Sequence, residues 1–182
     1  YKVTGVQTCA LPISASTFDA LANLCDHVIV DSRRFTQPSS DLAAVAARRG
    51  QGKRITDLAW LRLRPWRRAL AEAFERVSWL PGTPTTATIR HGRQALGAAT
   101  LLGDWLGERL GARIQFDTGG DPQSPSPDGV AVTTSAFEID LARPRQQIRV
   151  HVSTPEHCFL PFTVPASRGT DADLLAGAID LA

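Results

Sequence analysis

Basic and aromatic side chains gather between residues 48 and 68, the part of the chain best suited to bind another molecule. Asp57 is the only acidic residue there, and Trp60 and Trp66 lie among the cations. Arginine beside aromatic rings is typical of nucleic-acid-binding surfaces, and Trp and Arg are also enriched at the hot spots of protein interfaces. A third interpretation places the Trp rings in the core and the arginines on a solvated rim. The cations are Arg48, Arg49, Lys53, Arg54, Arg62, Arg64, Arg67 and Arg68.

The net charge of the whole chain separates these interpretations in part. Twenty Lys and Arg residues against 18 Asp and Glu residues leave a formal net charge of +2. Nucleic-acid-binding domains ordinarily carry a larger basic excess. The composition therefore disfavours a nucleic-acid partner and leaves both the protein interface and the core-and-rim interpretation open.

The remaining reactive side chains do not form a convincing catalytic set. Residues 156–158 read Glu-His-Cys and His151 precedes them, but this spacing matches no zinc pattern. Cys25 or Cys158 would need a nearby base and a lowered pKa to act as a nucleophile. The sequence also lacks a Gly-rich phosphate loop followed by Lys and Ser or Thr. We therefore predict no catalytic residues, no cofactor and no metal site.

The chain has 182 residues, of which 43% are hydrophobic, and this composition is typical of an ordinary globular protein. No apolar run reaches the length of a membrane span, so we predict no membrane partner. Apart from Cys9, the chain has only Cys25 and Cys158, which lie far apart in the sequence. Two distant thiols favour a reducing compartment, and we expect a cytoplasmic protein.

The first fourteen residues are predicted to be foreign to the protein. Residues 3–13 read VTGVQTCALPI, which is what a common sequencing-library adapter encodes when it is translated. Such foreign segments are excluded before the fold is considered. The alternative is a native strand over Val3 to Cys9 with a turn at Pro12. We expect residues 1–14 to be an adapter-derived segment and residues 15–182 to be an N-terminally truncated domain.

Hydrophobic periodicity predicts an α/β fold with a mixed sheet, largely antiparallel C-terminal strands and helices packed on the sheet. Helices are expected from about residue 16, from Asp41 to Gly50, at 57–61, from Pro65 to Val77, at 94–110 and after Thr170. Strands are expected at 28–30, 85–90, 112–117, 137–141, 148–152 and 158–164, and a mobile loop at 118–129.

Two of these strands form the best-defined predicted hairpin. Pairing the apolar residues places Leu141 opposite Ile148 and Asp140 opposite Arg149, with a loop from Ala142 to Gln147. A slip of one residue would bury the charges, so the alternation defines which face is buried.

Two segments of the chain resemble a known family. These are residues 18–35, FDALANLCDHVIVDSRRF, and residues 55–74, ITDLAWLRLRPWRRALAEAF. Both are similar to OpcA, the glucose-6-phosphate dehydrogenase assembly protein family, whose signature reads DLNW-x-RLTPWR. The chain departs from it at Ala59, in place of Asn, and at Arg64, in place of Thr. Because Arg cannot cap a helix as Thr does, the second change is expected to cost about 1 kcal/mol of local helix stability.

The resemblance implies a non-catalytic protein that binds glucose-6-phosphate dehydrogenase and promotes its assembly and allosteric activation in the oxidative pentose phosphate pathway. It also implies that the family's N-terminal part is missing, and it raises redox control at Cys25 or Cys158. An alternative is a sugar-phosphate enzyme of lactonase or isomerase type, and a weaker one is a nucleic-acid-binding module. The predicted partner-binding residues are Trp60, Arg62, Arg64, Trp66, Arg67 and Arg149.

Overall fold

The chain folds into two compact units. The computed structural model describes residues 7–8, 15–35, 37–166 and 170–180. Unit 1 comprises residues 1–62 and 169–182, and unit 2 comprises residues 63–168. Most of the predicted adapter segment lies outside the described residues, so its foreign origin stays a prediction.

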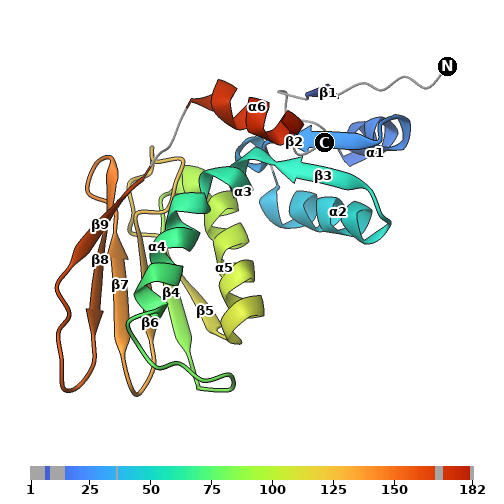
Figure 1. Cartoon of the computed structure of the whole chain (residues 1–182). Coiled ribbons are helices and arrows are strands. Elements are labelled where there is room, and N and C mark those ends of the chain that lie inside the picture. Colours follow the sequence, from blue (N-terminus) through green and yellow to red (C-terminus); the bar gives the residue numbers. More distant parts are fainter. Residues whose placement is uncertain (1–6, 9–14, 36, 167–169, 181–182) are drawn as a thin grey trace. The chain divides into compact units, whose positions relative to one another are not determined.

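Unit 1 is built on three parallel strands in the order β1-β2-β3 (Figure 1). Its strands are β1 (Gln7–Thr8), β2 (His27–Val30) and β3 (Arg54–Asp57), and its helices are α1 (Ala15–Leu24), the 3₁₀ turn η1 (Ser32–Arg34), α2 (Pro38–Gly50), α3 (Leu58–Arg62) and α6 (Asp171–Asp180). The predicted strand at 28–30 is confirmed as β2, whereas β3 was not foreseen.

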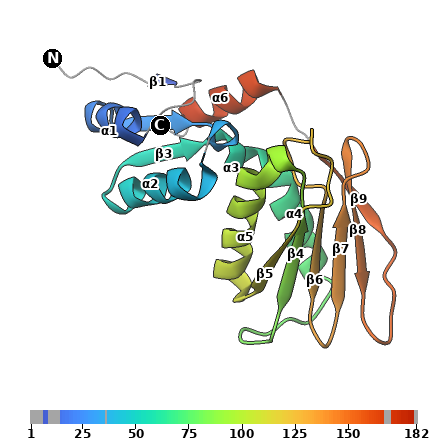
Figure 2. The same cartoon turned by 180° about the vertical axis from the view of Figure 1, so that it is seen from behind.

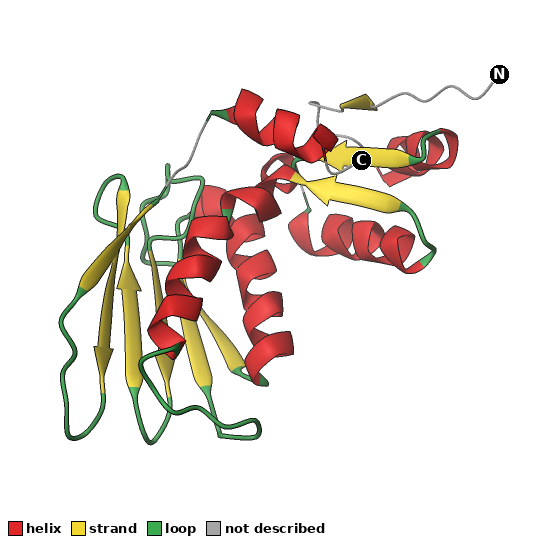
Figure 3. Cartoon of the chain, viewed as in Figure 1, coloured by secondary structure: helices red, strands yellow, loops and turns green. Residues whose placement is uncertain are grey.

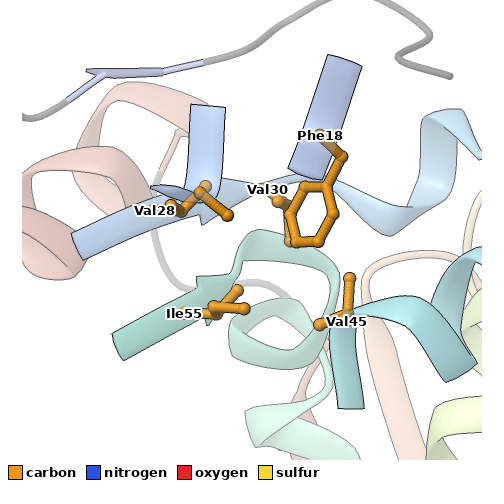
Figure 4. Close-up of a cluster of buried hydrophobic side chains, with 6 residues drawn as sticks. Phe18, Val28, Val30, Val45 and Ile55 are labelled. Carbon is orange, nitrogen blue, oxygen red and sulfur yellow. The ribbon is translucent and has the colours of Figure 1, made fainter. Parts of the chain in front are cut away.

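Helices cover both faces of the unit 1 sheet, which explains why all four residues of β2 are buried. On one face, side chains from α1, β2, α2 and β3 point toward one another (Figure 4). On the other face, Ile29 packs with Leu58 and with Ala178 of α6. The last helix of the chain therefore completes the core of the first unit. The labelled cluster in Figure 4 is Phe18, Val28, Val30, Val45 and Ile55.

Unit 2 is a six-stranded sheet in the order β5-β4-β6-β7-β8-β9, with β4 and β5 parallel and every other neighbouring pair antiparallel (Figure 3). Its strands are β4 (Thr86–Arg90), β5 (Arg113–Asp117), β6 (Gly129–Thr133), β7 (Glu138–Ala142), β8 (Gln147–Ser153) and β9 (Phe162–Pro165). Its helices are α4 (Arg64–Phe74), η2 (Arg93–Ala95) and α5 (Leu96–Leu110). The predicted fold class is confirmed.

Both long helices of unit 2 lie on the same face of its sheet (Figures 1 and 2). α4 packs on β7, β8 and β9, and α5 packs on β4 and β5. Leu70 on α4 and Leu102 on α5 are fully buried, as are Ile89 and Val150 on the sheet. The helix α5 ends at Gly111, whose φ of 62° is the left-handed cap that a Gly accepts without strain.

The predicted hairpin exists, but its register is wrong by two residues. Leu141 pairs with Val150 instead of Ile148, and Asp140 faces His151 instead of Arg149. A shift of two residues keeps every side chain on its own face, so the apolar alternation cannot detect it. The loop length decides the register: residues 143–146 close the turn, with Arg145 at φ 61°.

Candidate functional site

Four charged side chains close a ring at the carboxyl end of the unit 1 strands. Asp31 follows β2, Arg62 ends α3 and Asp171 opens α6. Arg62 bonds Asp31 through Nη1 at 3.1 Å and Asp171 through Nη2 at 2.8 Å. Arg33 bonds Asp31 at 2.8 Å and Asp171 at 3.3 Å through Nη2. We call Asp31, Arg33, Arg62 and Asp171 the ion-pair ring.

Mutual pairing sets the electrostatics of this ring. Burial acts to raise the pKa of Asp31, but hydrogen bonds and charge from Arg33, with the charge of Arg62, hold that pKa below its ordinary value. The hydrogen bond from Arg62 is the main reason that the pKa of Asp171 is lowered. Two carboxylates balance two guanidinium groups, so the ring is neutral and joins three segments of unit 1.

The cap of α6 places Asp171 in the ring. The Asp173 amide donates to Thr170 Oγ1 at 3.3 Å, and the Thr170 amide donates back to Asp173 Oδ2 at 2.6 Å. This capping box confirms the predicted helix start after Thr170. Asp171 then lies in the first helical turn, where a negative charge also complements the helix dipole.

A buried carboxylate lies at the end of the neighbouring strand. Asp57 is only 2% exposed, and its Oδ1 accepts the amides of Ser32 at 3.2 Å and Ala59 at 2.9 Å. It thereby caps α3 and ties β3 to the turn after β2. Burial, the strongest influence, raises the pKa of Asp57 against the lowering effect of these hydrogen bonds. The Ser32 side chain also acts to lower the pKa of Asp57.

The six predicted partner-binding residues are divided between the two units. Trp60 and Arg62 belong to α3 of unit 1, and the other four belong to unit 2. Arg62 takes part in the ion-pair ring, with 19% of its side chain exposed. Trp66 is completely buried and donates from Nε1 to Ser126 Oγ at 3.2 Å, so its ring is part of the unit 2 core.

The three predicted arginines of unit 2 are divided between helix α4 and the face of the sheet opposite that helix. Arg64 is exposed and Arg67 is half-buried, both in the first turn of α4. Arg149 is exposed on β8, on the face of the sheet opposite α4 and α5. Burial and then the charge of Arg64 lower the pKa of Arg67.

The prediction that Arg64 removes a helix cap is wrong, because residue 64 is not the capping position of α4. The capping position of α4 is Leu63, and no side chain caps the helix there. Arg64 is already the first helical residue and Pro65 the second, where its missing N–H costs nothing. A Thr at position 64 would therefore not act as the cap.

Sequence reasoning missed most members of the ring. Asp31 and Arg33 were visible in the first family-like segment, but their distance from Arg62 in the sequence gave no sign of contact. Asp171 was recognised only as part of a helix start. One usable signal was that Asp31 directly follows β2 and Asp57 is the last residue of β3, since the carboxyl ends of parallel strands meet at one edge.

The structure also shows where the two cysteine thiols lie and whether side chains that commonly bind metals come together. Cys25 is partly buried in unit 1 and Cys158 is exposed in unit 2. Across the described ranges, no three or more His, Cys, Asp and Glu side chains converge in a way that could hold a metal ion. Over the same ranges, no helix combines the length and apolarity that crossing a bilayer requires.

Comparison with known proteins now decides the family. Residues 53–181 match the family model OpcA_G6PD_C, which describes the C-terminal domain of a glucose-6-phosphate dehydrogenase subunit. This chain belongs to the OpcA family. That match includes the second family-like segment, β3 with α3 and α4, and every element of unit 2.

Two curated relatives carry the OpcA name. A putative OxPP cycle protein OpcA from Nostoc punctiforme is 35% identical over 97 residues, which cover 51% of this chain and 20% of that protein. The protein of the same description from Synechocystis is 41% identical over 58 residues, or 32% of this chain and 12% of that protein. The chain thus matches a fifth or less of the length of these relatives.

Solved structures with a similar fold are reductases. KijD10, a 3-ketoreductase from Actinomadura kijaniata, has a TM-score of 0.57 at 15% identity and matches 97% of this chain and 68% of its own. Its open conformation has a TM-score of 0.58 at the same identity, over 97% of this chain and 67% of its own. At this identity the likeness concerns the fold alone.

Proposed function

We propose that this OpcA-family chain is a non-catalytic, cytoplasmic partner of glucose-6-phosphate dehydrogenase that promotes assembly and allosteric activation of that enzyme. The observation that carries the proposal is the family match over residues 53–181. A partner that binds one oligomeric state of an enzyme more tightly shifts the population toward that state by its difference in affinity. Activation then requires no chemistry from the partner.

The arrangement of charges in unit 1 supports this role. Arg33 lies in η1 directly after β2 and Arg62 ends α3 directly after β3, near the carboxyl ends of strands, where α/β proteins often bind ligands. Both are engaged by Asp31 and Asp171 in the ion-pair ring. A substrate phosphate would have to displace those carboxylates, which makes the ring better suited to holding unit 1 together than to catalysis.

The first turn of α4 is the proposed docking surface. Arg64 in that turn and Arg68 directly after it are exposed, and the turn contains no acidic side chain. The positive end of a helix dipole lies at the same place, so the turn attracts carboxylates of a partner. Exposed charges of this kind chiefly raise the association rate and define orientation. We therefore propose an acidic patch on the dehydrogenase as the complementary surface.

The experiment compares three forms of the chain against purified glucose-6-phosphate dehydrogenase. We expect the double variant Arg64→Glu, Arg68→Glu to weaken binding by at least about tenfold at low salt, mainly through slower association. Arg109→Glu, at an exposed position of α5, should bind like the unchanged chain. Binding kinetics by surface plasmon resonance and the dehydrogenase oligomer by light scattering provide the readouts.

Two results would contradict the proposal at different levels. If the unchanged chain neither binds the dehydrogenase nor alters its oligomer and KM, the partner role is wrong for this chain. If binding occurs but survives the double variant, the partner role stands and the α4 surface is wrong. Turnover of a sugar phosphate by the chain alone would favour the enzyme alternative.

A further inference from the structure

The two edge strands of the unit 2 sheet differ in how well they are protected against pairing with another chain. β9 has four residues and ends at Pro165, which has no N–H to donate to a further strand. β5, at the other edge, has five residues without a proline, and all of them except the half-buried Ile114 are exposed (Figure 2). An unprotected edge is a template for strand pairing. β5 is therefore the edge at which another strand can add.

Alternate residues of β5 direct their main-chain groups away from the sheet. The Arg113 amide donates to Thr85 O at 2.9 Å, so the main chain of Arg113 faces β4. Main-chain groups alternate in direction along a strand, and the residues two and four positions further on face β4 as well. Ile114 and Phe116, which lie between them, each direct one N–H and one C=O outward.

Within unit 2, the loop that follows β5 runs away from this edge. The Gly120 amide donates to His91 O at 3.3 Å, and the Asp128 amide donates to Arg90 O at 2.9 Å. The loop thereby passes the carboxyl end of β4 on its way to β6. It leaves the outer side of β5 accessible.

We propose that β5 pairs antiparallel with β5 of a second copy of this chain, around a two-fold axis that passes through Gln115. The sequence of β5, RIQFD, is complementary to itself in this register. Arg113 faces Asp117 of the second copy, and Ile114 faces Phe116 of the second copy. Because the dimer is symmetric, each of these contacts occurs twice.

The directions of the main-chain groups fit this register. In an antiparallel ladder, pairs that exchange two N–H···O bonds alternate with pairs that exchange none and whose side chains lie closer together. Ile114 and Phe116 form the hydrogen-bonded pairs, because their groups point outward. Arg113 and Asp117 fall in the closer pairs, where opposite charges stabilise the ladder. Main-chain hydrogen bonds supply the affinity, as they do wherever a strand adds to a sheet edge.

Charge and main-chain direction disfavour the neighbouring registers. A shift of two residues places Arg113 or Asp117 opposite Gln115 and loses the opposite-charge pairs. A shift of four residues places Arg113 opposite its own counterpart, or Asp117 opposite its own, and like charges directly opposite each other are destabilising. An odd shift sets outward main-chain groups against groups already bonded to β4. The register centred on Gln115 is therefore preferred.

The helix that covers β5 forms a second layer around the same axis. α5 packs on β4 and β5, and a Cβ added to Gly103 would lie 3.0 Å from Ile114 and 3.2 Å from Phe116. Gly103 is therefore level with Gln115, and the axis passes beside it. Because α5 lies over both strands, the two α5 axes are separated by two strand spacings of about 4.8 Å, or roughly 10 Å. Packed helices lie at this distance.

Two leucines of α5 extend this helix contact. Leu96 and Leu110 lie seven residues before and seven residues after Gly103, on the same side of the helix. The two helices run antiparallel around the axis, which places Leu96 of one copy opposite Leu110 of the second copy. In the single chain Leu96 is 41% and Phe116 47% exposed. Pairing covers both side chains.

One strand and one helix from each copy make a contact smaller than that of permanent dimers. Interfaces of this class associate weakly and reversibly. The proposal therefore predicts a dimer whose population rises with protein concentration. It concerns association of this chain with itself, whichever further partner it binds.

The test compares the unchanged full chain with Arg113→Glu and Asp117→Lys by sedimentation velocity from about 1 to 200 µM. Each variant alone sets like charges opposite each other twice, so its dimer should be at least about tenfold weaker. An equal mixture of the two variants restores both opposite-charge pairs and should associate like the unchanged chain. Arg149→Glu changes an exposed charge on β8, away from this edge, and should have no effect.

Hydrogen exchange shows whether the contact is at β5. The amides of Ile114 and Phe116 should gain protection as the concentration rises. The Arg113 amide, already bonded to Thr85, should not change. A dimer that leaves the two outward amides unprotected would contradict the proposal.

Folding is checked separately, because Asp117 Oδ1 also accepts the Gly119 amide at 2.9 Å. Each variant must keep the thermal transition of the unchanged chain, and Asp117→Asn retains the acceptor, loses the charge and should also weaken the dimer. A monomer at every concentration overturns the proposal, as does a dimer indifferent to both reversals or a mixture of folded variants that fails to associate. Loss of dehydrogenase binding in Arg113→Glu, with the unchanged chain monomeric, would assign the edge to that enzyme and overturn self-pairing.

Discussion

At the scale of single residues, Arg62 shows how a predicted docking side chain becomes a structural one. Its guanidinium bonds two carboxylates that come from different ends of the sequence, Asp31 and Asp171. The planar guanidinium group of arginine suits this task better than the ammonium group of lysine, because it directs separate N–H groups to separate partners. The ion-pair ring therefore depends on Arg at position 62.

Replacing Arg62 should loosen unit 1. Arg62→Ala leaves Asp31, whose side chain is only 8% exposed, without one of its two cations. We expect a loss of about 1–3 kcal/mol in the free energy of unfolding, with a smaller loss for Arg62→Lys. Amide exchange in β2 and α6 measures it. Arg68→Ala, which removes an exposed cation of α4, should leave those amides unchanged; an equal effect of both changes would refute the assignment.

The buried Asp57 predicts a dependence of stability on pH. Its folded-state pKa lies above the ordinary value of 3.8 because of burial. Between pH 3.8 and that raised pKa, the folded state holds more protons than the unfolded state. Stability of unit 1 therefore falls as pH rises through this window.

Asp57→Asn removes the titration and keeps an oxygen for the amides of Ser32 and Ala59. Urea midpoints across pH 4 to 8 should fall less with rising pH in this variant than in the unchanged chain. Asp31 and Asp171, with lowered pKa values, act in the other direction, and their contribution is lost only below pH 3.8. Parallel pH profiles would contradict the role given to Asp57.

At the scale of elements, the sequence predicts which segments are helices and strands better than how they pair. Regular alternation identified β7 and β8, and the 3.6-residue period identified α4 and α5. The register of the hairpin failed because a two-residue shift keeps the same faces. β3 was missed because its four residues directly precede a helix, and the pattern of the helix obscured them.

Prediction of the candidate site from the sequence meets the same limit, because local patterns do not reveal contacts between distant residues. Trp66 is at a core position of an amphipathic helix, which its spacing with Leu70 and Ala73 already indicated. Arg33 and Asp31 are neighbours in sequence, but the other hydrogen bonds of the ion-pair ring join residues 31 to 138 positions apart. Local sequence periodicity cannot predict such contacts. Family-like segments marked Arg33 and Arg62 as parts of two motifs, but only the fold brings their side chains together.

At the scale of the whole molecule, unit 1 is discontinuous in sequence and unit 2 is continuous. Removing α6 should therefore damage the first unit. In a chain ending at Ala166, Ile29 and Leu58 lose their contact with Ala178, which is fully buried. We expect the amides of β2 and β3 to lose protection against hydrogen exchange, while those of β7 and β8 keep it. Protection retained in β2 would show that α6 is dispensable.

The split of unit 1 has a consequence for biosynthesis. α6 leaves the ribosome only after all of unit 2 has been translated, an interval of roughly 5–20 s at about 5–20 residues per second. Until then the side of β2 that carries Ile29 lacks the cover that α6 provides, and Arg62 lacks its contact with Asp171 at the α6 cap. The later-made unit can thus mature first, and the nascent chain exposes an apolar surface that chaperones are able to recognise.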